Sequence, residues 1–430
     1  MHRTETWGRR GRPAVVAALV AALAVLATAC SSGRDPAAET TILRVRMTDD
    51  WVTPPFVAAV RAFEQAHPDV RVDVSKAPIS HMLDDVRTAI RNGEPPDVVQ
   101  AHAFSAAAQG LAQPLDDLWA KKKPLKTSDF LAGAIDDVTW GKRLYGVPLD
   151  TNALFLLYDR DQFAAANVTP PADGSGFSFS SFETAARALT SPDGSRRALA
   201  IPTSTWWTYG WIRANGGDVL ATGPDGKVHL TFDDPKTVAA LDYLRRLVAA
   251  GLAFAPGAAD SHSTDAFALF RSGNSSTLAS GSWDLTTVTK DDAGKARYAS
   301  MPLPTGLPGK NGSVMGGSSM FVPNGSKHRE LAFQFMANLI SDPFALRLAK
   351  EQGRLPVRTA LYKDPYFQSP DLTAVRTQLT GASAFKLSAF PGPHDIFASA
   401  IDQILRENKE AGPVMADAQQ RAQPLLPNSP

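Results

Sequence analysis

The residues best suited to chemistry in this chain are clustered aromatic rings. The segment TWWTYGW, residues 205–211, which we expect to be a loop, holds four of them, and a further tryptophan lies in GSWD, residues 281–284. Flat rings cover the apolar C–H faces of a sugar, and nearby polar side chains bond its hydroxyl groups. We therefore expect ligand contacts from Trp206, Trp207, Tyr209, Trp211 and Trp283. The alternative is that some of these rings, including two of the four in the first segment, pack in the core; of the four, we expect Trp206 to face the ligand.

Polar residues after predicted strands are the second group of candidates. Asp150 and Asn152 follow Val-Pro in GVPLDTN, where a carboxylate could chelate two vicinal hydroxyls or make a structural hydrogen bond. Arg354 offers a bidentate donor to a ligand, or an ion pair at the surface. Strand-end position adds four more candidates, of which the histidine could equally be a satisfied structural residue: Asp50, Trp51, His102 and Phe104.

Motifs of catalysis are missing from the chain. We find no HExxH, CxxC, GxSxG or phosphate-loop pattern, and no residue pattern demands a metal or a cofactor. Among the pairs of adjacent acids, three could suggest a glycosidase: Asp116-Asp117, Asp136-Asp137 and Asp291-Asp292. Adjacent side chains point apart on a strand or helix, so a glycosidase dyad would need partners from elsewhere. We expect these pairs to lie in solvated turns, and we expect no catalytic residue.

Strands and helices alternate along the N-terminal half and would position these candidates. Residues 42–47 and 95–101 are predicted strands, and the helical spacing of apolar residues predicts a helix over 55–66. Another predicted helix spans 80–91, with Ser80 as its cap. This order predicts a doubly wound α/β lobe, which binds ligands beyond the carboxyl ends of its strands. Further predicted elements are a strand over 154–158 and helices over 182–189, 236–250, 329–340 and 396–406.

Length and charge set the broad class. A chain of 430 residues is too long for one ordinary domain and suits two. Without its first 29 residues it has 40 basic and 42 acidic residues, a net charge of −2. This balance gives no electrostatic reason to expect a nucleic-acid partner, and it suits an uncharged ligand.

The N-terminus has the layout of a secretory signal. Four arginines precede an uncharged apolar run over 14–26, and small residues precede Cys30, which is the sole cysteine. This arrangement resembles the bacterial lipoprotein signal, in which the cysteine is diacylated; plain secretion is the alternative. We expect a signal peptide over 1–29, a lipidated tether over 30–40 and a location on the outer face of the cell membrane. The sequence leaves the export route open between the general secretory and twin-arginine pathways.

Ordered blocks across residues 42–420 resemble one family, the extracellular solute-binding proteins of carbohydrate ABC importers. The clearest block is GKRLYGVPLDTNALFLLYDRDQF, residues 141–163. Other blocks are PPDVVQAHAFSAAAQGLAQPLDDL at 95–118, NGGDVL at 215–220, DGKVHLTFDDPKTVAALDYL at 225–244, GSWD at 281–284, GGSSMFVPNGSKHRELAFQFMANL at 316–339 and GRLPVRTALY at 353–362.

The resemblance implies a periplasmic-binding-protein-like fold, two doubly wound α/β lobes joined by hinge strands. By this similarity the first lobe takes 41–151 and 300–345, and the second takes 152–299 and 346–430. The hinges would lie near 149–154 and 298–302. Gly317 and Ser318 would belong to a turn that approaches the ligand, and Trp283 would stack on a sugar ring.

The function that the resemblance implies is capture of a sugar or oligosaccharide by a monomeric receptor that closes around it. Its partners would be ABC permease subunits in the membrane, to which a lipid anchor at Cys30 would attach the protein. Another chain would supply the ATP motor. Three alternatives stay open: a receptor for glycerol phosphate or a glycerophosphodiester, a secreted glycoside hydrolase, and a surface scaffold without a ligand.

Overall fold

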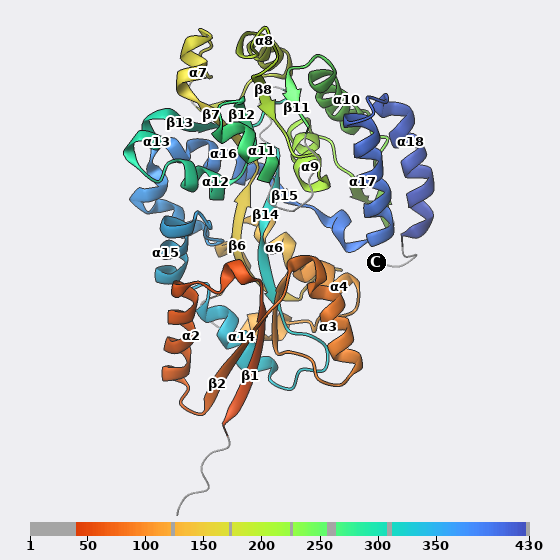
Figure 1. Ribbon diagram of the computed structural model, residues 1–430. Coiled ribbons are helices and arrows are strands. Elements are labelled where there is room, and N and C mark those ends of the chain that lie inside the picture. The colour runs from red at the N-terminus through yellow and green to blue at the C-terminus, as the bar shows by residue number, and fades with distance from the viewer. Residues whose placement is uncertain are drawn as a thin grey trace, which may run out of the picture.

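The computed structural model describes residues 40–121, 125–171, 174–223, 227–255, 264–307 and 312–426. The predicted signal peptide and Cys30 lie outside these ranges. Two sheets organise the chain and lie in separate lobes, with strands β6 and β14 running between the lobes (Figure 1).

The larger sheet has the strand order β15-β14-β3-β1-β2, and β6 also pairs with β14. Strands β1, β2 and β3 run parallel, as predicted for a doubly wound lobe. In β1 the alternating side chains Leu43, Val45 and Met47 are fully buried. Burial of every second residue is the pattern that favours a strand. The bounds are β1 Thr41–Met47, β2 Val70–Lys76, β3 Val98–Ala101, β6 Gly146–Ala153, β14 Ser313–Phe321 and β15 Ala382–Ala384.

The smaller sheet has the order β11-β8-β12-β7-β13, with antiparallel pairing of β7 to both β12 and β13. Its bounds are β7 Phe155–Asp159, β8 Arg197–Ala200, β11 Ala253–Phe254, β12 Ser275–Ser280 and β13 Tyr298–Met301. Two short hairpins lie apart from the sheets, one of β4 (Thr139–Trp140) with β5 (Arg143–Leu144) and one of β9 (Leu220–Thr222) with β10 (Val228–Leu230).

Helices surround both sheets (Figure 1). Their starts follow ordinary capping chemistry, as where Asp159 accepts from two backbone amides of α7 and Asp234 precedes Pro235 of α10. The bounds are α2 Pro54–Ala66, α3 Met82–Arg91, α4 Ala103–Ala108, α5 Asp116–Lys121, α6 Ala132–Asp137, α7 Arg160–Ala165, α8 Phe179–Leu189, α9 Thr205–Ala214, α10 Pro235–Ala249, α11 Thr264–Arg271, α12 Ser282–Val288, α13 Asp292–Arg297, α14 Arg329–Asn338, α15 Asp342–Gln352, α16 Thr373–Gly381, α17 Pro391–Leu405 and α18 Ala411–Ala422.

The chain passes between the two sheets at two places that bear on the site. Strand β6 ends at Ala153 and β7 begins at Phe155, so Leu154 is the link between the sheets. The return runs from Met301 at the end of β13 to Ser313 at the start of β14. Strands β6 and β14, which adjoin these two links, pair with each other and form one antiparallel ribbon, the β6–β14 ribbon.

Four local expectations differ from the structure, the first being that the acid pairs lie in solvated turns: Asp116-Asp117 begin α5, and Asp136-Asp137 end α6, where Asp137 is buried. Ser80 lies in a 3-10 turn, Ile79–His81, and caps no helix, since α3 begins at Met82. Residues 382–384, which we expected in the second lobe, pair with β14 of the larger sheet. The aromatic segment 205–211, which we expected to be a loop, forms most of helix α9.

Residues 40–121, together with the later described ranges, contain no helix that is long and apolar enough to cross a membrane.

Candidate ligand-binding site

A strip of polar side chains runs along one face of the β6–β14 ribbon. Asp150 and Asn152 are two residues apart on β6, so their side chains leave the same face. In the register of the ribbon Asp150 lies opposite Ser318, and Asn152 lies opposite Gly316. A bulge follows Ser318. The two crossing strands therefore place the predicted residues together.

A closed ring of hydrogen bonds occupies one end of this strip. Asp150 accepts from the Ser318 backbone amide at 2.8 Å and from the Ser318 hydroxyl at 2.9 Å. Arg354 donates to Asp150 at 3.4 Å and also to the Asp50 carboxylate. Bonds from Thr48 to Asp50 and Gln100, and from Gln100 to Ser318, complete the ring. Its members are Thr48, Asp50, Gln100, Asp150, Ser318 and Arg354.

Two of these ring members, Thr48 and Gln100, were not predicted from the sequence. Gln100 is 3% exposed and lies in β3, between apolar neighbours. A buried polar residue needs a hydrogen-bond partner. The glutamine in the otherwise apolar run VVQA was therefore a usable signal that polar groups meet beside this strand.

The two carboxylates of the ring differ in their surroundings. Burial raises the pKa of Asp150, and the Arg354 and Ser318 contacts oppose that rise. For Asp50 burial also acts to raise the pKa, but the bonds from Thr48 and Arg354 prevail and lower it. Arg354 is therefore held between one deeply buried carboxylate and one that reaches solvent.

The other end of the strip is aromatic. Trp206 of α9 and Trp283 of α12 are half-buried, with ring centroids 6.1 Å apart and planes inclined by 48°. Trp206 also approaches the ribbon, since a Cβ on Gly316 would lie 2.7 Å from its indole and 2.2 Å from the Asn152 Oδ1. A glycine at 316 thus allows the indole and the amide to meet over the strand.

Two polar atoms at this aromatic end have no hydrogen-bond partner among the described residues. They are the Asn152 Oδ1, an acceptor, and the Trp283 Nε1, a donor. Both atoms are buried, and an unpaired buried polar atom is costly. An acceptor and a donor beside two indole rings are the contacts that a hydroxyl-rich ring would satisfy.

Three predicted aromatic contacts lie in the core instead. Trp207, Tyr209 and Trp211 are only 3%, 2% and 0% exposed. The Trp207 Nε1 donates to the Ala279 carbonyl, and the Tyr209 hydroxyl donates to Asp218. Helix α9 is covered on almost all sides, so only Trp206 among its rings reaches the strip. These three rings therefore present no surface to a ligand.

Trp51 and Phe104 are also buried, each 1% exposed. The guanidinium of Arg354 lies over the Trp51 ring, 4.3 Å from its centroid. Phe104 packs in a hydrophobic cluster with residues of the smaller sheet and of α9. Neither ring presents a free face to solvent.

His102 forms a pair with Asp137 of α6, with 2.7 Å between its Nδ1 and the carboxylate. Burial opposes protonation of His102, but Asp137 and the more distant Asp150 raise its pKa above the ordinary value. Phe104 lies beside it, with ring centroids 5.6 Å apart. The sequence offered no signal for Asp137 as a partner, because 35 residues separate the two.

This pair predicts a pH-dependent contribution to stability. A raised pKa in the folded state means that the contribution is full below the ordinary histidine pKa of 6.5 and is lost as the pH rises through the raised value. Asp137→Asn should therefore reduce the free energy of unfolding more at pH 5.5 than at pH 8.5. The difference should be at most about 1 kcal/mol, because the His102 side chain is 37% exposed and water screens the pair. Equal losses at both pH values in urea titrations would contradict this assignment.

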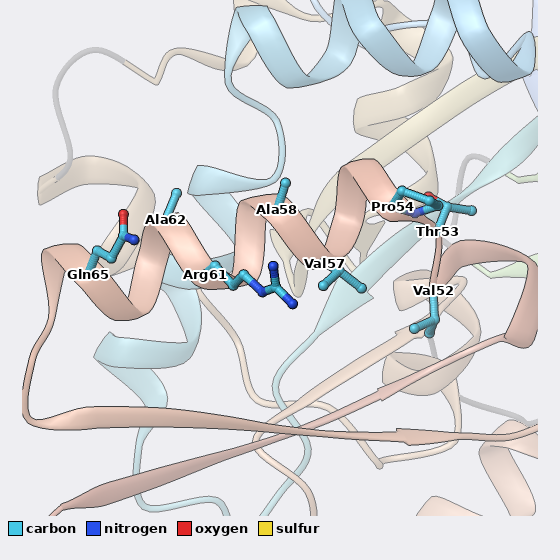
Figure 2. A pocket seen from close by; sticks show the side chains of 8 residues that line it. All are labelled: Val52, Thr53, Pro54, Val57, Ala58, Arg61, Ala62 and Gln65. Carbon is cyan, nitrogen blue, oxygen red and sulfur yellow. The ribbon is translucent and has the colours of Figure 1, made fainter.

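A separate cavity of about 580 Å³ lies along α2 and the turn before it (Figure 2). Its lining includes Val57, Arg61 and Gln65, and none of the residues predicted for the site. The polar strip and this cavity are therefore distinct features of the larger lobe.

Comparison with known proteins places the chain in a family. Residues 49–345 match the model of the bacterial extracellular solute-binding proteins. The chain belongs to this family. The family consists of extracellular solute-binding proteins, in agreement with the resemblance of the sequence blocks.

Two curated relatives cover most of the chain. The protein named "Uncharacterized lipoprotein in oleD 5'region" of Streptomyces antibioticus is 26% identical over 394 residues, covering 89% of this chain and 86% of that protein. The maltodextrin-binding protein MdxE of Bacillus subtilis is 24% identical over 365 residues, covering 82% of each chain.

Solved structures share the fold. The sugar-binding protein MalE of Xanthomonas citri superposes with a TM-score of 0.76 at 19% identity, covering 90% of this chain and 97% of that chain. UgpB of Mycobacterium tuberculosis, solved in complex with glycerophosphocholine, gives 0.74 at 19% identity, covering 89% and 98%. The predicted two-lobed α/β fold is confirmed by these superpositions.

Proposed function

We propose that this protein is a saccharide receptor of an ABC importer and that the polar strip of the β6–β14 ribbon is its ligand site. One observation carries the proposal. The half-buried indole of Trp206 lies beside Trp283 and, over Gly316, beside Asn152; the Asn152 Oδ1 is an unpaired acceptor and the Trp283 Nε1 is an unpaired donor. Rings of this kind cover the C–H faces of a sugar, while the unpaired atoms bond its hydroxyls.

The position of the strip suits a receptor that closes on its ligand. Both strands that carry it pass from one lobe to the other, and Trp206 and Trp283 come from the helices of the smaller sheet. A ligand that touches both lobes favours the closed state by its higher affinity for that state. Hinge segments near 149–154 and 298–302, with lobes divided at these points, are part of this proposal.

The carboxylates of the site support binding rather than catalysis. Both Asp50 and Asp150 are engaged with the one guanidinium of Arg354, and Asp150 accepts two further bonds from Ser318. Glycoside hydrolysis needs one carboxyl group that donates a proton and a second that acts on the sugar or on water. We therefore propose that the protein is not an enzyme.

The partners and location follow from the family and from the N-terminal sequence. We propose that Cys30 carries the lipid anchor, a view supported by the lipoprotein name of one relative. Several acyl chains would hold the protein stably at the outer face of the membrane. There a monomeric receptor would deliver its ligand to the permease subunits.

A glycerophosphodiester is the second candidate ligand, because UgpB shares this fold and was solved with glycerophosphocholine. A phosphate in the strip would have to compete with Asp50 and Asp150 for Arg354. The three charges already compensate one another in part. The unpaired atoms on Asn152 and Trp283 lie at the aromatic end instead, so the geometry favours a neutral ligand.

A thermal-shift screen tests the proposal. The secreted chain from residue 31 onward would be heated with mono- and oligosaccharides of several linkages and with glycerophosphodiesters. A saccharide at 100 times its Kd should raise the free energy of unfolding by about 2.7 kcal/mol. A response to glycerophosphodiesters alone would move the assignment to the second candidate, and no response from a folded protein would contradict both.

A further inference from the structure

Arg354 lies over the buried Trp51 ring at the hydrogen-bonded end of the polar strip. Its guanidinium lies 4.3 Å from the centroid of the Trp51 ring, a distance typical of a cation–π contact. Two of its nitrogens reach carboxylates, one to Asp50 and one to Asp150. An indole that is covered in this way has no face left for a sugar ring.

The backbone on both sides of Arg354 is fixed to the site. The Ser282 hydroxyl donates to the Gly353 carbonyl at 2.6 Å, directly before Trp283 in the chain. Gly353 has a φ of +67°, and a Cβ there would lie 2.6 Å from the Ser282 carbonyl oxygen. On the other side, Leu355 and Thr151 exchange backbone hydrogen bonds of 2.9 and 3.2 Å. The guanidinium is therefore held in place by its own main chain as well as by its ion pairs.

We propose that Arg354 is the residue that limits the length of the saccharide, by blocking the Trp51 end of the strip. The ligand then occupies the aromatic end, between Asn152, Trp206 and Trp283, and is a short saccharide. A longer chain would need the space that the arginine fills. This inference rests on the proposed saccharide-binding function.

The test is a ladder of oligosaccharides measured by isothermal titration calorimetry on the folded protein. The probes are malto- and chito-oligosaccharides of one to six units. Arg354→Ala removes both the volume and the charge of the side chain, whereas Arg354→Met removes the charge and keeps an unbranched side chain of similar volume. Arg347→Ala is the matched control, because it removes an exposed ion pair with Glu351 on α15, outside the strip.

In the wild-type protein the preferred ligand should be a mono- or disaccharide, with at least tenfold weaker binding of the hexasaccharide of the same linkage. Arg354→Ala should reduce this preference at least tenfold, while Arg354→Met and Arg347→Ala keep it. Thermal midpoints of all variants show whether they are folded.

Two results would overturn the inference alone: wild-type protein that binds the hexasaccharide as tightly as the disaccharide, or Arg354→Ala that weakens every length by the same factor. If Met and Ala change the profile equally, charge and not volume sets the length, and the blocking role is wrong. If the wild-type protein binds no saccharide at all, the proposed function fails and this inference with it.

Discussion

Replacing Trp206 with alanine should weaken saccharide binding by about 2 to 4 kcal/mol, the loss seen when a central aromatic contact of a binding site is removed. At 25 °C this corresponds to roughly a 30- to 1000-fold increase in Kd. Trp206 approaches both Asn152 and Trp283, so its loss would remove one wall of the site. Calorimetric titration with the saccharide found by the thermal screen measures the change.

The neighbouring tryptophan provides the control. Trp207→Phe keeps a ring in the core but removes the hydrogen bond to the Ala279 carbonyl and leaves a smaller ring against Trp206, so it should cost about 1 to 3 kcal/mol of stability and change the Kd far less than Trp206→Ala does. The two side chains are adjacent in sequence but differ in exposure, which separates ligand contact from packing. Binding that survives Trp206→Ala, or that is lost in Trp207→Phe, would contradict the placement of the site.

The order of strands and helices in the first lobe was predictable because it depends on local patterns. In β1 apolar and polar residues alternate, and in α2 the residues Phe56, Val60 and Phe63 recur at helical spacing and are buried. The predicted strand over 95–101 and the helix over 236–250 also correspond to β3 and α10. The strand order was not predicted, because β14, which comes from residues 313–321, lies beside β3 in the same sheet.

The burial of individual rings was not predictable in the same way. Residues 205–211 are aromatic at four of seven positions, so no periodic pattern distinguishes a buried helix from an exposed loop. The structure resolves this by covering almost the whole of α9, including a close approach of Gly210 to Leu154. One ring of the four reaches the site, and which one depends on contacts distant in sequence.

The hydrogen-bonded ring around Asp150 could not be predicted from local sequence patterns either. The partners of Asp150 lie 168 and 204 residues along the chain, at Ser318 and Arg354. The sequence left two possibilities for Arg354, a ligand donor or an ion pair. The structure shows the ion pair and also shows that it is largely shielded from water, which no local pattern indicates.

Asp150→Ala should lower the free energy of unfolding by about 3 kcal/mol. The side chain of Asp150 is 4% exposed and accepts from Arg354 and from the amide and hydroxyl of Ser318. Removing one partner of a buried ion pair costs about 3 to 5 kcal/mol. We expect the lower limit because Arg354 keeps its bond to Asp50.

Asp50→Ala tests whether burial is the reason, because it removes the other carboxylate from the same guanidinium. The Asp50 side chain is 54% exposed, so water screens this pair and the loss should be about 1 kcal/mol or less. Urea titrations of both variants at pH 7 compare the two directly. Equal losses would mean that Arg354 does not distinguish its partners by burial. A larger loss at Asp150 would instead mean that Arg354 is held mainly by its buried partner in β6 and only weakly by the solvent-facing Asp50.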